Sequence, residues 1–263
     1  MLYLLLEHQV KILLKQKKKY LELSKKSNFK LNIDFYPRNR ESKKDYYKKI
    51  IKNLDGPSCV IIAVPDNLHY KIAKYCLQSG LHCLVVKPFT TKVSHARELC
   101  QIAKEKKLIS FVEFHKRFDK SNRIAKSNFL NNSLGDLNYV IVNYSQRKEI
   151  PVERFKAWSN KTNIFNYLGV HYIDLIYFIT KAKPIRAMAI GQKNFLKEKR
   201  INTYDSIQCL VEWRCKNSYN FIQTINVNWI DPKSSSAMSD QKMKLIGTNG
   251  RLELDQKDRG ITI

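Results

Sequence analysis

The chain has 263 residues, of which 43% are hydrophobic, so it can form one large or two ordinary globular domains with apolar cores. Its formal net charge of +25 favours an acidic partner, whether nucleic acid, an anionic membrane or a phosphorylated small molecule, without choosing among them. No run of 18 apolar residues occurs, and the opening "MLYLLLEHQV" is a poor signal peptide because Glu7 interrupts its short apolar run. A membrane-spanning protein is therefore not expected.

The lysines and cysteines argue against two further kinds of protein, nucleic-acid binders and metal or dithiol proteins. Lysine clusters such as "KQKKK" and "KEKK" fall where helix faces are expected. They can form solvated helix faces or a surface that binds nucleic acid. No RNA-binding strand motif, zinc knuckle or recognition helix accompanies them, so solvated faces are favoured and nucleic acid is not an expected partner. The six cysteines include no C-x-x-C pair, so no metal site is expected, and free thiols in apolar segments predict a reducing, cytoplasmic location.

The first half of the chain alternates between helix and strand. Residues 1 to 26 have helical periodicity, and residues 29 to 36 alternate in polarity like a strand. Further on, strands are expected at 59–64, 82–86 and 108–114, and helices at 45–54, from about 66 to Gly80, and at about 92–107. Short connections and the right-handed crossover rule make consecutive strands parallel neighbours.

The second half changes character after a linking helix near 119–131. Strands of alternating polarity are expected at 138–146, 185–191, 204–213, 219–229, 242–247 and 251–254, with one amphipathic helix at about 168–180. The predicted fold class is α/β plus α+β, with an incomplete Rossmann-like parallel sheet in residues 1–120. An antiparallel-sheet domain with helices follows in residues 121–263.

The segment "VKPF" places Lys87 directly after a buried strand. In an open parallel sheet, ligands bind beyond the carboxyl ends of the strands, where both this segment and "VPDN" (64–67) lie. A residue before proline is driven towards extended geometry, so Pro88 gives Lys87 a defined direction. The alternative is a lysine that ends a strand in solvent.

A second candidate site is the stretch "NIFNYLGVHYIDLIYFI". His171 and Asp174 lie three residues apart and face the same way on a helix that is otherwise apolar. Such a histidine can be a satisfied core residue. Gly169, Asn163 and Asn166 just upstream favour instead a helix start that opens onto a cleft, and the two interpretations stay open.

Three segments in this order resemble one family. "VIIAVPDNLHYKIAKYCLQSGLHCLVVKPFT", "FVEFHKRFD" and "YLGVHYIDLIYF", with the later "GTNGRLELDQKDRG", resemble the Gfo/Idh/MocA oxidoreductases, the glucose-fructose oxidoreductase and inositol dehydrogenase family, over residues 45–263. The resemblance implies a domain that binds NAD or NADP, followed by a sheet domain that supplies the substrate face and often the oligomer contact. Such enzymes move a hydride between a sugar or polyol carbon and nicotinamide.

The resemblance also implies roles for single residues. Lys87 corresponds to the lysine beside the nicotinamide and the substrate hydroxyl, and His171 to the histidine that exchanges the hydroxyl proton. A histidine suits that exchange near neutral pH, and a lysine cation stabilises the developing negative charge on the oxygen. The cofactor side is expected to include Val64, Pro65, Asn67, His69, Lys87 and Pro88. The substrate side is expected to include His115, Arg117, Trp158 and Asn166.

The sequence departs from the family pattern in several places. Val86 stands where the family usually has a glutamate before the lysine. Tyr167 stands where many members have an aspartate four residues before the histidine, which leaves Asp174 as a weaker candidate for orienting His171. No glycine precedes Gly56, so the glycine-rich turn that approaches the cofactor's pyrophosphate is missing.

Two explanations of these departures stay open, and a fragment of a longer reading frame is favoured over a degenerate paralogue. The first function hypothesis is an NAD(P)-dependent oxidoreductase acting on a sugar, polyol or nucleotide-sugar, homo-oligomeric through its second-domain sheet. The alternative is a non-catalytic family member that binds a ligand or partner. Arg38 and Arg40 would favour NADP if they follow the second strand of a dinucleotide fold.

Overall fold

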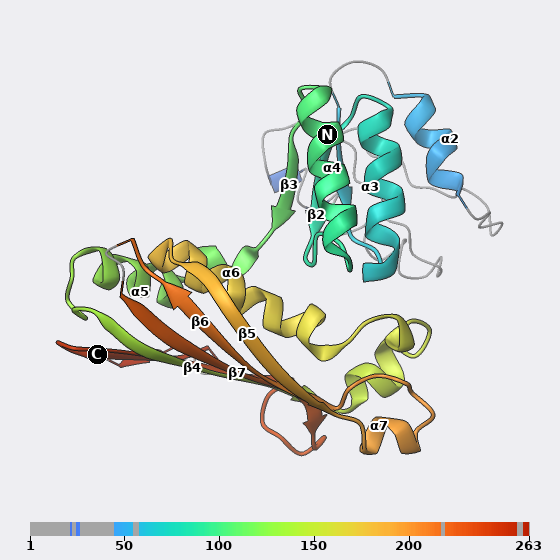
Figure 1. The fold of residues 1–263 in the computed structure, drawn as a ribbon. Coiled ribbons are helices and arrows are strands. Elements are labelled where there is room, and N and C mark those ends of the chain that lie inside the picture. The colour runs from blue at the N-terminus through green and yellow to red at the C-terminus, as the bar shows by residue number, and fades with distance from the viewer. Residues whose placement is uncertain are drawn as a thin grey trace. The chain divides into compact units, whose positions relative to one another are not determined.

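The computed structural model describes residues 22, 25–26, 45–54, 58–216, 219–256 and 260–262 (Figure 1). The chain divides into two compact units, Met1–Glu113 and Phe114–Ile263, whereas the sequence placed the boundary near residue 120. Most of the helix expected at 1–26, the strand expected at 29–36, and Arg38 and Arg40 lie outside the described residues.

The first unit contains a parallel sheet with the strand order β1-β2-β3. Its strands are β1 (Cys59–Ile62), β2 (His82–Val86) and β3 (Ser110–Glu113), and β2 pairs in parallel with both neighbours. Each crossover contains one helix, α3 (His69–Gln78) or α4 (Val93–Glu105), which confirms the predicted alternation. The carboxyl ends of all three strands therefore lie at the same edge of the sheet.

The core of the first unit lies between this sheet and its helices. α3 and α4 lie side by side along the sheet (Figure 1), and α2 (Tyr46–Lys52) adds Tyr47 and Ile51 to the same core. Buried residues from the strands and crossover helices include Val60, Ile62, Ile72, Cys76, Leu77, Val85 and Leu99. Their apolar stripes at helical and strand spacing explain why the sequence predicted these elements well.

The second unit contains a seven-stranded sheet with the order β10-β9-β8-β4-β7-β6-β5. Its strands are β4 (Leu137–Arg147), β5 (Lys183–Gln192), β6 (Ser206–Arg214), β7 (Asn220–Asp231), β8 (Ser239–Gly247), β9 (Arg251–Asp255) and β10 (Gly260–Thr262). The predicted antiparallel arrangement is wrong for one pair, since β4 runs parallel to β7. Alternating polarity is the same in both kinds of pairing, so the sequence pattern could not reveal this.

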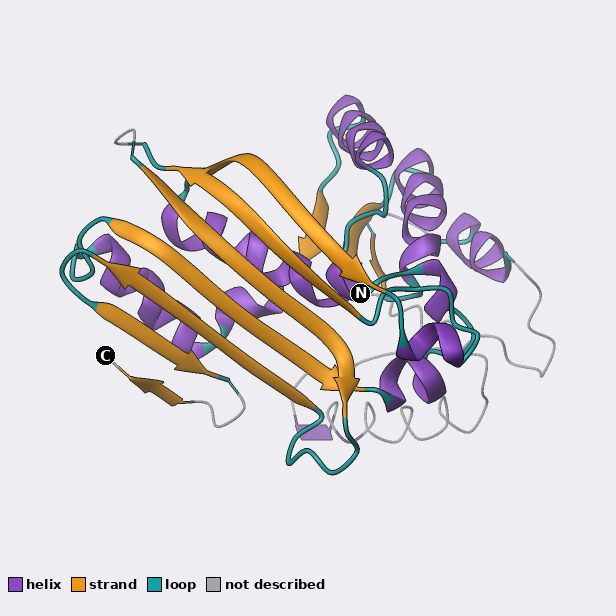
Figure 2. Ribbon diagram, turned by 60° about the horizontal axis from the view of Figure 1, so that its bottom comes forward, coloured by secondary structure: helices purple, strands orange, loops and turns teal. Residues whose placement is uncertain are grey.

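Two helices, α5 (Lys120–Leu130) and α6 (Val170–Thr180), cover one face of this sheet (Figure 2). Val140, Val142 and Tyr144 of β4 point to that face and are buried, while β5 is exposed along its whole length. The sheet is thus apolar on the helix side and open on the other side (Figure 2). The connections contain short helical turns: η2 (His115–Phe118), η3 (Ile150–Arg154), η4 (Ser159–Lys161), η5 (Phe165–Gly169) and α7 (Phe195–Glu198).

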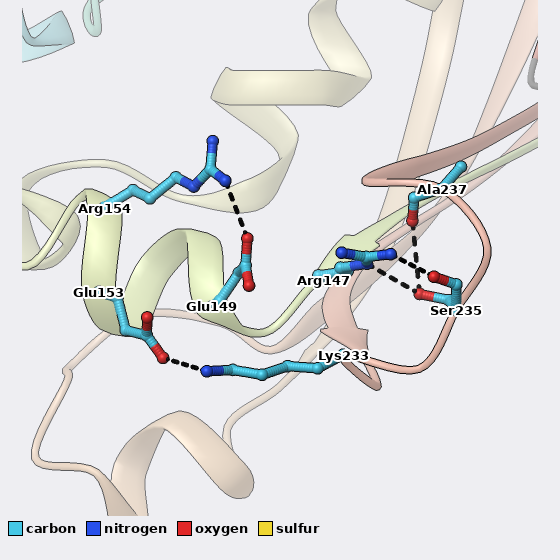
Figure 3. Close-up of polar contacts among 7 residues, drawn as sticks. All are labelled: Arg147, Glu149, Glu153, Arg154, Lys233, Ser235 and Ala237. Carbon is cyan, nitrogen blue, oxygen red and sulfur yellow. Dashed lines mark hydrogen bonds and ion pairs between the residues drawn. The ribbon is translucent and has the colours of Figure 1, made fainter.

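Polar contacts fasten the loop between β7 and β8 to the segment that follows β4 (Figure 3). The Arg147 guanidinium donates to the Ser235 backbone carbonyl, and the Lys233 ammonium lies 2.7 Å from Glu153 of η3. A third pair, between Arg154 and Glu149 at 3.0 Å, lies within the segment after β4. Two segments far apart in the sequence are thereby held at one end of the sheet.

Three further findings concern the kind of protein. Within the described ranges, every helix is too short or too polar to span a bilayer. The same residues contain no cluster of three or more histidine, cysteine or acidic side chains able to hold a metal ion. All six cysteines are free thiols, and four of them are buried.

Candidate active site

The loops after β1 and β2 are joined by one buried histidine. The Nδ1 atom of His69 lies 2.6 Å from the carbonyl oxygen of Pro88, and its Nε2 atom lies 2.8 Å from the carbonyl oxygen of Val64. The side chain is 1% exposed. A doubly protonated ring donates to both oxygens, whereas a neutral ring donates to one. His69 thus holds together two loops that the sequence assigned to the cofactor side, with both ring nitrogens turned towards protein.

Lys87 directly follows β2 in the second of these loops. Its side chain is largely buried, and the Lys87–Pro88 peptide bond is cis. Val86, which replaces the family's usual glutamate, pairs with Glu113 on β3. Since paired residues on neighbouring strands face the same side of a sheet, a carboxylate does lie beside position 86, but on the adjacent strand. Sequence reasoning missed this residue because register across a crossover cannot be read locally.

His171 lies in the first turn of α6 and is also largely buried. Its ring centroid is 4.8 Å from that of His115, with an angle of 71° between the ring planes. The centroid of the Phe114 ring is 6.3 Å from that of the His171 ring, and the two rings meet edge to face. The structure thus brings together His115 and His171, two expected site residues that are 56 positions apart in the sequence.

The turn that precedes His171 is a π-helical turn, η5. The Asn166 backbone N–H donates to the Asn163 side-chain oxygen at 2.9 Å, which fixes the first residues of this turn. At Gly169, an added Cβ atom would come within 2.7 Å of the Phe165 ring, so this close approach excludes a larger residue unless the ring moves. Turns of this kind often occur at functional sites, and here the turn sets the direction from which α6 begins.

Asp174 is paired with Arg117. The Arg117 Nε atom donates to Asp174 Oδ2 at 2.7 Å, and its Nη2 atom donates to Oδ1. This hydrogen-bonded carboxylate raises the pKa of the Arg117 guanidinium. Both carboxylate oxygens of Asp174 accept hydrogen bonds from Arg117. Asp174 is therefore paired with Arg117, whereas the sequence suggested it as a candidate for orienting His171. This two-bond contact between Arg117 and Asp174, called the Arg117 fork below, joins η2 to α6.

Trp158 and Tyr167 belong to an aromatic cluster. The Phe155 ring is 4.4 Å from the Trp158 ring and 5.0 Å from the Tyr167 ring, and the Trp229 ring completes the cluster. Tyr167 occupies the position at which the family resemblance led us to look for an aspartate. The side chain at this position therefore contributes aromatic packing, and Trp158 packs against it through the cluster.

Lys116 is a buried residue that sequence reasoning missed. It lies between His115 and Arg117 in η2, and its ammonium donates to Gln241 and, at 2.8 Å, to Gln256. Burial lowers the pKa of the Lys116 ammonium to about 8. The partners lie 125 and 140 residues away in the sequence, so no local pattern could have identified them.

Comparison with known proteins assigns both halves of the chain. Residues 9–114 match the sequence model of an oxidoreductase family with an NAD-binding Rossmann fold, and residues 123–253 match the GFO/IDH/MocA C-terminal domain. The chain belongs to the Gfo/Idh/MocA oxidoreductase family. The first match reaches back to residue 9, well before residue 45, where the resemblance read from the motifs begins.

Among curated members of the family, the scyllo-inositol 2-dehydrogenase (NADP(+)) IolW of Bacillus subtilis is 28% identical over 145 residues, 54% of this chain and 40% of that protein. The UDP-N-acetylglucosamine 3-dehydrogenase of Acidithiobacillus ferrooxidans is 26% identical over 135 residues, 50% of this chain and 39% of that protein. This chain thus matches less than half the length of either relative.

Solved structures of the family share the fold. An inositol dehydrogenase homologue of Azotobacter vinelandii, in complex with NADH and myo-inositol, has a TM-score of 0.68 at 20% identity over 80% of this chain and 54% of that one. At this identity the likeness concerns the arrangement of helices and strands.

The described residues of the first unit fit the general position of a dinucleotide cofactor. The loops after β1 and β2 lie at the carboxyl edge of a parallel sheet, where such cofactors bind, and His69 holds these loops in place. No glycine precedes Gly56 in the sequence, so the close backbone approach that a glycine-rich turn gives a pyrophosphate is not provided there.

Proposed function

We propose that this chain acts as a cytoplasmic oxidoreductase that moves a hydride between NAD or NADP and a carbon of a sugar, polyol or nucleotide-sugar. Family membership and the names of its relatives, which act on inositol and UDP-N-acetylglucosamine, support this class of substrate. Six free thiols support a reducing compartment. The observation that carries the proposal is the position of His171 at the start of α6, with its ring against His115.

His171 is the proposed proton acceptor. A nicotinamide cofactor, when bound, supplies the hydride chemistry. As the substrate carbon is oxidised, its hydroxyl group must lose a proton, and an imidazole can take that proton near neutral pH. The ring contact with His115 and the π-helical turn before α6 limit the orientations of the His171 ring, which keeps the accepting nitrogen in one place.

Lys87 is the proposed electrostatic partner. An ammonium group that hydrogen-bonds the substrate oxygen favours the negative charge that develops on it. Val64, Pro65, Asn67 and Pro88 are proposed to contact the cofactor together with Lys87, and His69 to hold their loops in place. His115, Arg117, Trp158 and Asn166 are proposed for the substrate side. Asp174 would act there by fixing the Arg117 guanidinium.

Cofactor titration followed by a substrate panel tests this function. We expect saturable enhancement of NADH or NADPH fluorescence on adding the protein, followed by cofactor reduction with at least one inositol, hexose or nucleotide-sugar. The cofactor that binds more tightly decides between NAD and NADP. Absence of saturable binding for both cofactors would overturn the proposal.

One observation favours a second candidate function. Because no glycine precedes Gly56, the chain could bind a sugar ligand or a partner subunit without catalysing hydride transfer. That alternative predicts sugar binding in calorimetry without any effect of NADH or NADPH. Saturable dinucleotide binding would argue against it.

The open face of the second-unit sheet is the proposed homo-oligomer contact. Apolar side chains are exposed on it: Met188, Ile190, Leu210, Ile222 and Ile230. Exposed apolar side chains gathered on one face of a sheet are typical of protein interfaces. We expect light scattering to give at least twice the chain mass, and Met188→Lys with Ile190→Lys to give a smaller species. A monomer in both cases would contradict this contact.

A further inference from the structure

Three consecutive residues of η2 contact two different parts of the second unit, helix α6 and the sheet. The His115 ring lies against His171, and the Arg117 guanidinium is paired with Asp174 of α6. Between them, the Lys116 ammonium donates to Gln241 of β8 and to Gln256, which follows β9. Lys116 thus connects this turn to the sheet.

The environment of Lys116 is unusual for a lysine. Its side chain is only 5% exposed, and it forms no ion pair within the part of the chain that the structure describes. Its charge is met by two neutral amide oxygens and by the faces of Tyr144 and Tyr172, whose ring centroids lie 5.4 and 6.0 Å away. Burying a charge outside an ion pair is costly, and the attraction of the Asp119 carboxylate offsets that cost only in part, so a surface role does not explain this placement.

The partners of Lys116 are themselves fixed. The Gln256 backbone N–H donates to the Gln241 backbone oxygen at 2.9 Å, which joins the two glutamines. On the other side, the buried Asn122 side chain of α5 donates to the Lys116 backbone oxygen at 2.8 Å. Lys116 therefore lies between a strand pair and a helix, with its ammonium tied to the strands and its backbone tied to α5.

We propose that Lys116 is a positioning residue that fixes η2 against the sheet and thereby holds the His115 ring on His171. Without the ammonium, η2 keeps its attachments to α5 and α6 but loses its attachment to β8 and β9. The turn can then shift, and the two histidine rings with it. The catalytic consequence of this shift rests on the proposed function, whereas the structural consequence does not.

The principal test is Lys116→Met, which keeps most of the side-chain length and removes the charge. We expect the imidazole NMR signals of both His115 and His171 to move, and kcat to fall roughly tenfold with KM within about twofold, as for a general base held less firmly. Lys244→Met is the matched control, because the Lys244 ammonium also links β8 to β9, at 3.0 Å from Glu253, but at the surface. It should move neither signal.

Two variants of Gln256 keep the test decisive if Lys116→Met does not fold. Gln256→Leu removes one acceptor and should shift the same histidine signals in the same direction, by less. Gln256→Glu gives the ammonium a carboxylate partner and should preserve the signals and kcat. In a folded Lys116→Met protein, adding Gln256→Leu should have little further effect, because the contact is already lost.

The outcomes separate this inference from the proposed function. Histidine signals that stay unchanged in both Lys116→Met and Gln256→Leu would overturn the positioning role, whatever the activity. A protein without turnover on any substrate, in which Lys116→Met still moves both signals, would support the positioning role and contradict the proposed function. Equal shifts in Lys116→Met and in the Lys244→Met control would also overturn the inference.

Discussion

The two candidate regions are held in place in different ways. Around Lys87, a buried histidine binds backbone carbonyls of two loops that lie 24 residues apart in the sequence at Val64 and Pro88. Around His171, side chains bind other side chains from distant segments, as in the Arg117 fork and the Lys116 contacts. The comparison shows that the first region is specified by a compact stretch of sequence, whereas the second depends on the assembly of the whole second unit.

The largest expected effect tests whether both regions serve one reaction. Lys87→Ala and His171→Ala should each lower kcat by roughly 10²- to 10⁴-fold, the range typical of a lost acid–base or electrostatic group. Steady-state kinetics with the best substrate measures this effect, and a melting curve of each variant shows that the protein stays folded at the assay temperature, since both side chains are largely buried. If either variant loses stability but retains its turnover, that residue has a structural role and the comparison fails.

The backbone-held region should respond strongly to loss of His69. His69→Leu removes the ring whose nitrogens contact the buried carbonyl oxygens of Val64 and Pro88, so we expect the free energy of unfolding to fall by about 2–4 kcal/mol in urea denaturation. His69→Gln, which can donate to one of the two oxygens, should lose less. An unchanged stability in His69→Leu would mean that the two loops do not depend on this side chain.

The side-chain-held region has a pH signature. Because the pKa of Lys116 falls from 10.5 to about 8 on folding, the unfolded chain binds more protons than the folded chain between these two values. Stability should therefore rise with pH across that interval, by about 2 kcal/mol from pH 8 to about 9.5. Urea denaturation of the unaltered chain and of Lys116→Met isolates the effect as a difference. A difference that stays constant with pH would show that folding does not lower the pKa of Lys116.

The smallest expected effect concerns the Arg117 fork. Asp174→Asn should lower the free energy of unfolding by about 1–2 kcal/mol, since the Asp174 side chain is 9% exposed and accepts two hydrogen bonds. Glu153→Gln is the control, because its pair with Lys233 is exposed on both sides and should contribute less than about 0.5 kcal/mol. Equal losses in the two variants would remove the distinction between the fork and a surface pair.

Much of the fold could be predicted from local pattern. The parallel sheet of the first unit follows from apolar runs such as "CVIIAV" and "HCLVV", with amphipathic crossover helices between them. The strands of the second unit were found from their alternating polarity. Their order was not, because the parallel pairing of β4 with β7 depends on contacts between distant segments.

The candidate site shows the same limit. Lys87 stood out because it follows a buried strand and precedes Pro88, and His171 because it is a polar residue at the start of an apolar helix. Glu113, paired with Val86, and Lys116, bonded to two glutamines, were invisible because their partners lie in other strands. The ion pair between Arg117 and Asp174 likewise became evident only from the coordinates. The sequence had assigned Arg117 to the substrate side and Asp174 to the orientation of His171.

The central position of β4 affects how this protein can be made. β4 ends at Arg147, yet its two neighbours in the sheet are β7, which begins at Asn220, and β8, which begins at Ser239. A ribosome must therefore add more than 70 residues before either edge of β4 can find its partner. During that interval both edges of β4 have unpaired backbone groups, so the second unit should fold late and depend on chaperones during its synthesis.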